Sequence, residues 1–242
     1  TAQMHQTLAA ASNDPAFAPE KFTRLYQRSL YQSMRTTCRR NLLLLRRRLN
    51  QLPREIRGTA AALADAETPI LGIFRRLLET RISALRTRVH GDYHLGQVLY
   101  TGKDFVIIDF EGEPARPISE RRIKRSPLRD VAGMLRSFHY AARSALHAAE
   151  KRGWVQPEQR ERLAAWGDYW STWMGAVFLA EYGQVAAEGA FLPADRDQQR
   201  VLLECYLMEK ALYELGYELN NRPHWVAIPL SGIRQLMRTI HP

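Results

Sequence analysis

A short β-rich stretch between residues 88 and 114 constrains the fold most, because the other apolar residues of the chain mostly follow helical spacing. Its sequence, RVHGDYHLGQVLYTGKDFVIIDFEGEP, contains two apolar runs, QVLY and DFVIIDF, on either side of the turn TGK. Two short β-rich runs around a glycine turn are typical of a hairpin. His, Asp, Glu and Gln residues flank both runs, which is an uncommon composition for a purely structural core. The stretch therefore predicts a small hairpin with a polar site at its ends.

Helical patterns account for most of the remaining chain. Apolar residues recur every three or four positions between Pro19 and Leu49, which predicts one long helix. In the segment SPLRD, Ser126 is the expected N-cap of another helix and Pro127 its first residue. Further helices are expected over residues 1–12, from about 55 to 88 with an interruption near Pro69, from SPLRD to about 152, over about 157–188 and 195–220, and near the C-terminus.

These patterns predict one mainly α domain over residues 1–242 with an embedded β-hairpin. It divides into a helical part (1–89), the hairpin with its flanking polar residues (90–113), an Arg-rich loop (114–125) and a second helical part (126–242). We find no internal repeat and no low-complexity linker.

Composition excludes several classes of protein. No run approaches the ~18 apolar residues of a transmembrane helix, and the first residues lack the pattern of a signal peptide. The two cysteines, Cys38 and Cys205, make a poor disulfide framework or metal site, so a cytoplasmic location is expected. The net charge of +10 would suit polyanions, but no zinc-finger spacing or aromatic RNA-binding signature supports specific nucleic-acid recognition.

The polar residues around the hairpin match the needs of phosphoryl transfer. That reaction uses a carboxylate near the acceptor hydroxyl and oxygen ligands for Mg²⁺. Protein kinases provide them in the pattern H-R-D-x-x-x-x-N, followed by D-F-G after a hairpin. Here Asp92 lies in HGD, Gln97 follows five positions later, and Asp109 begins DFE at the end of the second run. The alternative interpretation is that Asp92 caps a helix and Asp109 ends a strand.

Three stretches, HGDYHLGQVL, IIDFEGEP and SPLRDVAGMLRSFHYAA, together resemble the maltokinases, which belong to the aminoglycoside-phosphotransferase-like, eukaryotic-like kinase superfamily. The C-terminal sequence EKALYELGYELNNRPHWVAIPLSGI also looks like the end of that family, so the resemblance spans essentially the whole chain. It implies transfer of phosphate from ATP, with Mg²⁺, to maltose, giving maltose 1-phosphate for trehalose and α-glucan metabolism. Many members are fused to trehalose synthase, so such a domain is a candidate partner.

The resemblance also implies roles for residues of the hairpin region. Asp92 would be the catalytic base, and Gln97 and Asp109 would bind Mg²⁺. Glu111 would lie beside them, either as a second metal contact or water-positioning group, or as an ordinary loop acid.

Three further residues are assigned to the surroundings of this loop. His90 is expected to orient the loop rather than to react. Asp130 resembles a helix aspartate that supports the catalytic loop in related kinases, although an acid in the first turn of a helix is also favoured by the helix dipole. His94 is expected either to pack under the loop or to contact the acceptor.

A sugar acceptor would need aromatic faces and charged hydrogen-bonding groups. Residues that could line such a pocket, or could equally pack on the core with their hydroxyls at its rim, are Tyr206, Tyr213, Tyr217, Glu209, Glu214, Arg222 and Trp225. The tryptophans Trp166, Trp170 and Trp173 are expected in the core. Arginines of the 114–125 loop are expected to neutralise phosphate, to contact a neighbouring domain or to be solvated.

A kinase of this class also needs a β-rich N-terminal lobe with a phosphate-covering loop and a lysine. The residues before His90 predict helices instead, so the chain is expected to be a kinase-like C-terminal lobe that binds ATP poorly and turns over negligibly on its own. Two alternatives remain open. One is a related kinase acting on an aminoglycoside, choline or another sugar or alcohol. The other is a non-catalytic interaction domain of a trehalose synthase fusion.

Overall fold

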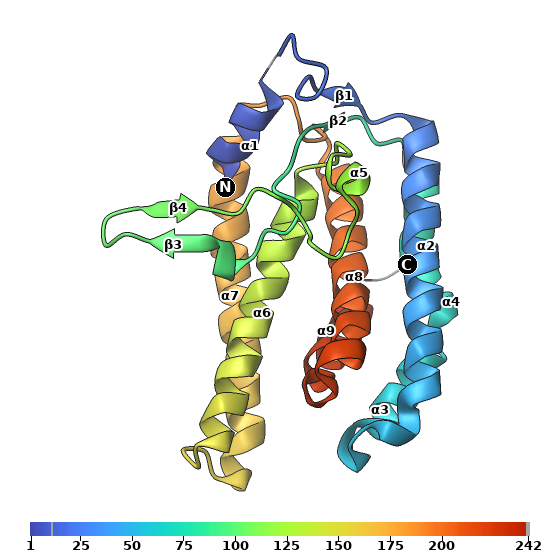
Figure 1. The fold of residues 1–242 in the computed structure, drawn as a ribbon, viewed down its shortest axis with the longest axis vertical. Helices are drawn as coiled ribbons and strands as arrows, with labels where there is room; N and C mark the ends of the chain where they lie inside the picture. Colours follow the sequence, from blue (N-terminus) through green and yellow to red (C-terminus); the bar gives the residue numbers. More distant parts are fainter. Residues whose placement is uncertain (11, 241–242) are drawn as a thin grey trace. The chain divides into compact units, whose positions relative to one another are not determined.

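The computed structural model describes residues 1–10 and 12–240 and is mainly helical, with two small sheets (Figure 1). Contacts divide the chain into two compact units. Unit 1 contains residues 1–20 and 85–192, and unit 2 contains residues 21–84 and the described residues from 193 onward. Within the described ranges, every helix is too short or too polar to cross a membrane.

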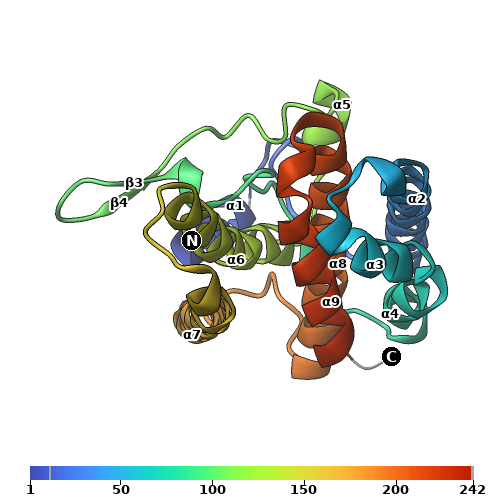
Figure 2. The ribbon, with the colours of Figure 1, turned by 90° about the horizontal axis from the view of Figure 1, so that it is seen from below.

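Unit 1 is built on two long antiparallel helices. Helices α6 (Leu128–Lys151) and α7 (Arg160–Ala186) lie side by side, and α1 (Ala2–Ala9) packs against α7 (Figures 1 and 2). Strand β1 (Glu20–Lys21), where the chain passes from unit 1 into unit 2, pairs with β2 (Leu85–Arg86). The remaining elements are η2 (Leu95–Gln97), β3 (Val98–Tyr100), β4 (Phe105–Ile107), α5 (Ile118–Arg121) and η3 (Pro157–Gln159).

The hairpin predicted from the sequence is confirmed. β3 and β4 pair antiparallel, with Val98 opposite Ile107 and Tyr100 opposite Phe105. Gly102 has a φ of +91°, which a residue with a Cβ rarely adopts, and the amide of Thr101 donates to the carbonyl of Asp104 at 2.9 Å. Glycine is therefore required in the TGK turn that returns the chain.

Helix boundaries differ from the prediction in several places. The helix expected over residues 1–12 ends at Ala9, and residue 11 lies outside the described residues. The region expected to be helical up to residue 88 ends at Glu79, because residues 85 to 87 form extended pairings instead. There Leu85 donates its amide to the carbonyl of Phe191, and Thr87 exchanges two backbone hydrogen bonds with Arg125. Helix α6 begins one residue later than expected, at Leu128, whose amide donates to the Ser126 hydroxyl at 3.3 Å.

The base of the hairpin packs on α6 and α7 through a small apolar core. Its buried members are Tyr93, Met134 and Phe138. The partly buried side chains around them are Val98, Ile107, Leu135, Met174 and Phe178. The loop that precedes β3 is therefore anchored in the core of unit 1 by Tyr93.

The prediction that the α7 tryptophans are core residues is wrong. Trp166 and Trp173 are 62% and 60% exposed, and Trp170 is 43% exposed. The reason is that α7 turns its small residues toward α6: a Cβ on Gly175 would lie 3.1 Å from Leu135, and one on Gly167 would lie 3.4 Å from Ala142. Close helix packing on the small side leaves the aromatic side chains facing outward.

Replacing an exposed tryptophan should therefore cost little stability. We expect Trp173→Gln to change the free energy of unfolding by less than about 0.5 kcal/mol, as for other surface positions. Loss of a core tryptophan would cost about 3–5 kcal/mol. Urea unfolding followed by circular dichroism distinguishes the two, and a loss in the core range would contradict the outward orientation of this side chain.

Unit 2 is a helical assembly of α2 (Arg24–Arg48), α3 (Arg54–Ala64), α4 (Glu67–Glu79), α8 (Arg196–Asn221) and α9 (Ala227–Thr239), with the short turns η1 (Leu49–Gln51) and η4 (Pro223–Trp225). Helix α2 begins after Thr23, whose side chain accepts from the amide of Tyr26. Burial raises the pKa of Cys38 to about 12 and raises that of Cys205, so both buried thiols stay protonated.

Candidate active site

The buried carboxylate of Asp130, in the first turn of α6, holds the loop from His90 to Gln97 through hydrogen bonds to its first two amides. Asp130 Oδ2 accepts from the His90 amide at 2.7 Å, and Oδ1 accepts from the Gly91 amide at 3.0 Å. Burial alone would raise the pKa of Asp130, but the hydrogen bond and charge of His5 and the two loop amides together lower it. Asp130 is thus an ionised acceptor placed beneath the two residues that precede Asp92.

His5, a residue that the sequence interpretation missed, completes this network. It lies in α1, is fully buried, and places Nε2 3.1 Å from Asp130 Oδ2 and Nδ1 2.9 Å from the Tyr182 hydroxyl of α7. Its signal in the sequence is a lone histidine in a short helix, far from the hairpin along the chain. Spacing alone could not connect it to the loop.

His90 joins the loop to the end of β4. Its Nε2 donates to the carbonyl of Ile108 at 2.8 Å, and its Nδ1 faces the amide of Asp92 at 3.4 Å. A carbonyl only accepts, so Nε2 carries the proton. The ring also packs on Tyr93 and Phe110, with centroid distances of 5.3 and 5.0 Å. One buried imidazole therefore holds together the residues just before Asp92 and just before Asp109.

Glycines allow the loop to approach its neighbours closely. A Cβ on Gly133 of α6 would lie 2.4 Å from the carbonyl oxygen of Tyr93, a separation that atoms do not tolerate. Gly91 and Gly112 both have positive φ, and a Cβ on Gly91 would lie 3.3 Å from the Cα of Gly112. The loop is thus held between α6 on one side and the segment after Asp109 on the other.

Asp92 follows Gly91 in this loop. Its side chain is 17% exposed, and its Oδ2 lies 3.9 Å from Nε2 of His94. Nδ1 of His94 accepts from the amide of Gly96 at 3.0 Å, which directs the Nε2 side of the ring toward Asp92. Neither of the two roles predicted for His94, packing under the loop or contact with the acceptor, is decided by these contacts, and both stay predictions.

Gln97 and Asp109 are brought into direct contact. The side-chain amide of Gln97 donates to Asp109 Oδ2 at 2.8 Å, and the amide of Ile108 donates to the carbonyl of Gln97 at 3.0 Å. Asp109 has a φ of +63°, which is uncommon outside glycine and is often found at functional sites. The hairpin thus places an exposed carboxylate next to a carboxamide at its base.

These two side chains fit a magnesium ion that shares its coordination with other groups. Mg²⁺ prefers oxygen ligands and usually keeps several waters or substrate phosphates, with only one or two protein carboxylates. Asp109 offers carboxylate oxygens, and the side-chain oxygen of Gln97 is not used in its hydrogen bond to Asp109. Among the residues that the structure describes, no three His, Cys, Asp or Glu side chains form a dedicated metal cluster.

Glu111 is less closely tied to the pair. It is exposed, and within residues 1–10 and 12–240 it makes no hydrogen bond to Gln97, Asp109 or Asp92. Its predicted place as a second metal contact, water-positioning group or plain loop acid stays open.

Apart from His94, the acceptor residues predicted from the sequence lie in unit 2. Tyr213 and Glu214 are half-buried on α8, and Tyr217 is 44% exposed. Arg222 lies over the rings of Tyr217 and Trp225, at 5.5 and 5.1 Å from their centroids. These positions leave the acceptor role of all four residues a prediction.

The buried carboxylate of Glu218, which the sequence interpretation missed, fixes Arg222. Two guanidinium nitrogens of Arg222 donate to it at 2.7 and 3.0 Å. Tyr206 and Glu209, two other members of the predicted set, are buried on α8. Their burial favours the alternative of core packing for these two.

Two cations of the arginine-rich loop form hydrogen bonds within unit 1, and the predicted roles of its other arginines stay open. Arg121 donates to the carbonyls of Arg116 and Pro114, and Lys124 is buried against Glu20 and the carbonyl of Pro15. These two cations therefore hold the loop within unit 1.

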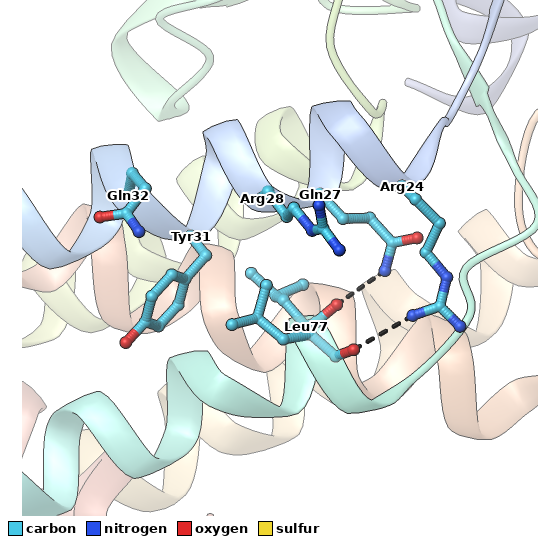
Figure 3. Close-up of a pocket in the computed structure, with 7 residues that line it drawn as sticks. Arg24, Gln27, Arg28, Tyr31, Gln32 and Leu77 are labelled. Atoms are coloured by element: carbon cyan, nitrogen blue, oxygen red, sulfur yellow. Dashed lines mark hydrogen bonds between the residues drawn. The ribbon is translucent and has the colours of Figure 1, made fainter.

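A pocket of about 510 Å³ in unit 2 lies between α2 and α4 (Figure 3). Gln27 and Arg24 reach from α2 and donate to the carbonyls of Leu77 and Leu78 at 2.7 and 3.1 Å. These carbonyls belong to the last turn of α4, where helices leave acceptors unpaired. The polar groups here cap a helix, and none of the predicted site residues lines the pocket.

Comparison with known proteins gives matches to sugar kinases. No family model matches the chain. The glucosamine kinase of Streptacidiphilus jiangxiensis is 24% identical over 98% of this chain and 47% of its own length. That of Mycolicibacterium smegmatis (strain ATCC 700084 / mc(2)155) is 30% identical over 61% of this chain and 34% of its own length. The chain thus spans about half the length of the first curated relative and a third of the second.

Solved structures show the same likeness. A glucosamine kinase in complex with glucosamine, ADP and inorganic phosphate has a TM-score of 0.70 and 20% identity, covering 98% of this chain and 52% of the other. Another structure, crystal form A, has a TM-score of 0.71 and 22% identity, covering 98% and 51%. The chain therefore has the fold of part of a glucosamine kinase, in agreement with the kinase-like fold predicted from the sequence. These matches are to glucosamine kinases and give no support to the maltokinase resemblance or to a trehalose synthase fusion.

Proposed function

We propose that this chain carries the catalytic loop and metal-binding strand end of an ATP-dependent sugar kinase. The observation that carries the proposal is the joining of the two motifs at the hairpin base. His90 binds the carbonyl before Asp109, and Gln97 binds Asp109 itself. An aspartate that only ended a strand would not require hydrogen bonds from a separate polar loop, whereas here His90 and Gln97 both bind the end of β4. The likeness to glucosamine kinases supports the same reaction class.

In this proposal Asp92 orients the acceptor hydroxyl and takes its proton as the hydroxyl oxygen attacks the γ-phosphorus of ATP. The bond from that phosphorus to the bridging oxygen of ADP breaks, and ADP leaves. Asp130 and His90 hold the loop so that the carboxylate does not need to reorganise during the reaction. Gln97 and Asp109 would hold the Mg²⁺, which when bound neutralises charge on the phosphate oxygens. Burial of Tyr93 beside Asp92 fixes the loop on the side facing the core.

The acceptor that we favour is an amino sugar of the glucosamine type. The matched proteins are named for glucosamine, and one structure contains it. Maltose, which the maltokinase resemblance implied, has no support among these relatives. It is retained as the second candidate because DFEGEP and the glutamine at position 97 carried that resemblance.

An acceptor panel with the full-length protein tests this function. Glucosamine, glucose, maltose, choline and an aminoglycoside are each supplied with Mg-ATP, ADP release is measured, and the product is identified by ³¹P NMR. We expect glucosamine to give the highest kcat/KM. A clear preference for maltose would contradict the acceptor assignment, and the absence of ADP release with every acceptor would contradict the kinase itself.

A further inference from the structure

We propose that His5 of α1 is a positioning residue for phosphoryl transfer, acting on the catalytic loop through Asp130. The inference rests on the proposed kinase function and adds a residue to the same site. His5 touches none of the reacting groups assigned above. Its contribution would be to keep the Asp130 carboxylate ionised and oriented toward the amides of His90 and Gly91.

The direction of the hydrogen bonds follows from the partners. An ionised carboxylate only accepts, so Nε2 of His5 donates to Asp130 whether the ring is neutral or charged. The other nitrogen, Nδ1, lies 2.9 Å from the Tyr182 hydroxyl. Burial, and then the charge of Asp130, raises the pKa of Tyr182, so the hydroxyl keeps its proton and can donate to a neutral ring. Tyr182 thus fixes the orientation in which Nε2 faces Asp130.

Because Asp130 is buried, each hydrogen-bond donor to its carboxylate contributes to keeping it ionised. Asp130 is 2% exposed and His5 fully buried, and a buried carboxylate is costly unless hydrogen bonds and charges compensate it. Oδ2 accepts from both His5 and the His90 amide, whereas Oδ1 accepts from the Gly91 amide. Without His5, the carboxylate would lose its side-chain donor and could turn or protonate, which would weaken its hold on both amides.

Loss of the Asp130 hydrogen bonds would displace Asp92, because the residue held by Asp130 is its neighbour in the chain. Gly91, whose amide Asp130 holds, has a φ of +89° and immediately precedes Asp92. A small displacement of a catalytic group can cost a large part of the rate, because the reaction depends on the orientation of the reacting atoms. His5 would therefore affect turnover more than nucleotide binding.

Two substitutions of His5, whose side-chain amides differ in length, test this inference. In His5→Gln the side-chain amide nitrogen can replace Nε2 and donate to Asp130. In His5→Asn the shorter amide corresponds to Nδ1, so it keeps the Tyr182 contact and loses Asp130. For the full-length protein we expect His5→Asn to lower kcat about 10- to 100-fold with KM for ATP changed less than about twofold, and His5→Gln to restore most of the loss.

A matched control separates loop positioning from simple anchoring of α1. Gln6 also lies on α1, and its side chain donates to the carbonyl of Val185 in α7 at 2.8 Å. If His5 only anchors the helix, Gln6→Leu should reproduce the kinetic loss, and that result would overturn the proposal. If His5 positions the loop, Gln6→Leu should leave kcat near the wild-type value.

Hydrogen exchange gives a readout that does not depend on turnover. In His5→Asn the amides of His90 and Gly91 should exchange faster than in the wild type, and His5→Gln should restore protection. Unchanged exchange in His5→Asn would overturn the inference even if the protein is an active kinase. If the wild type proves inactive on every acceptor, the proposed function fails, while faster exchange would still show that His5 holds the loop.

Discussion

Replacing Asp92 with asparagine in the full-length protein should lower kcat about 10²- to 10⁴-fold, the usual contribution of a general base. Asparagine has nearly the same shape but cannot accept the proton of the acceptor hydroxyl. The contacts that hold the loop, from Asp130 to the His90 and Gly91 amides and from His90 to Ile108, do not involve the Asp92 carboxylate. Folding and affinity for Mg-ADP should therefore be retained.

An aspartate of unit 2 provides the control for this substitution. Asp65 is 78% exposed in its side chain and pairs with Arg46 on the surface, so Asp65→Asn should leave kcat unchanged. Steady-state kinetics and calorimetric titration with Mg-ADP measure the two effects. Normal turnover by Asp92→Asn would remove Asp92 from the mechanism, and a parallel loss of nucleotide affinity would assign it to binding instead.

Gly133→Ala should destabilise the protein and displace the catalytic loop. The added Cβ would lie 2.4 Å from the carbonyl oxygen of Tyr93, and the backbone that carries each atom is held in place by other contacts. The amide of Leu95 donates to the Ser137 hydroxyl of α6 at 3.2 Å, and Tyr93 is buried in the core. Relief of the clash would move the loop away from α6, at a cost of about 1–3 kcal/mol, and kcat should fall as well.

Gly183→Ala is the matched control, because Gly183 is also a helical glycine of unit 1. A Cβ there would meet no atom within 4 Å. Alanine is a better helix former than glycine, so this variant should be stabilised by up to about 1 kcal/mol. Thermal unfolding and kcat of both variants decide the point. Equal stabilisation by the two alanines would show that α6 and the loop are not in the close contact described.

The parts of the site that could be predicted from the sequence are those encoded by short-range spacing. HGD, Gln97 and DFE lie within one stretch, and a hairpin turn is sufficient to bring its two ends together. The structure places Gln97 and Asp109 in hydrogen-bonding contact at the base of that hairpin. The support expected from Asp130 also rested on a local motif, SPLRD, and its carboxylate lies beneath the loop.

Features that depend on distant contacts could not be predicted in this way. His5 and Tyr182 meet Asp130 only after the chain has folded, and no spacing relates their positions. The orientation of α7 was predicted wrongly because both its small residues and its tryptophans could have faced the core. In the structure Gly175 packs closely on α6, so the small residues face the core and Trp166 and Trp173 are exposed. Helical periodicity identifies a face of a helix but not the neighbour that it meets.

The most direct test of the account is a crystal structure of the full-length protein with glucosamine, ADP and Mg²⁺. We predict that a sugar hydroxyl lies within hydrogen-bonding distance of the Asp92 carboxylate and that the metal ion is coordinated by oxygens of Asp109 and Gln97. A sugar bound out of reach of Asp92, or a metal ion held by other residues, would contradict the central claim that the hairpin base is the phosphoryl-transfer site.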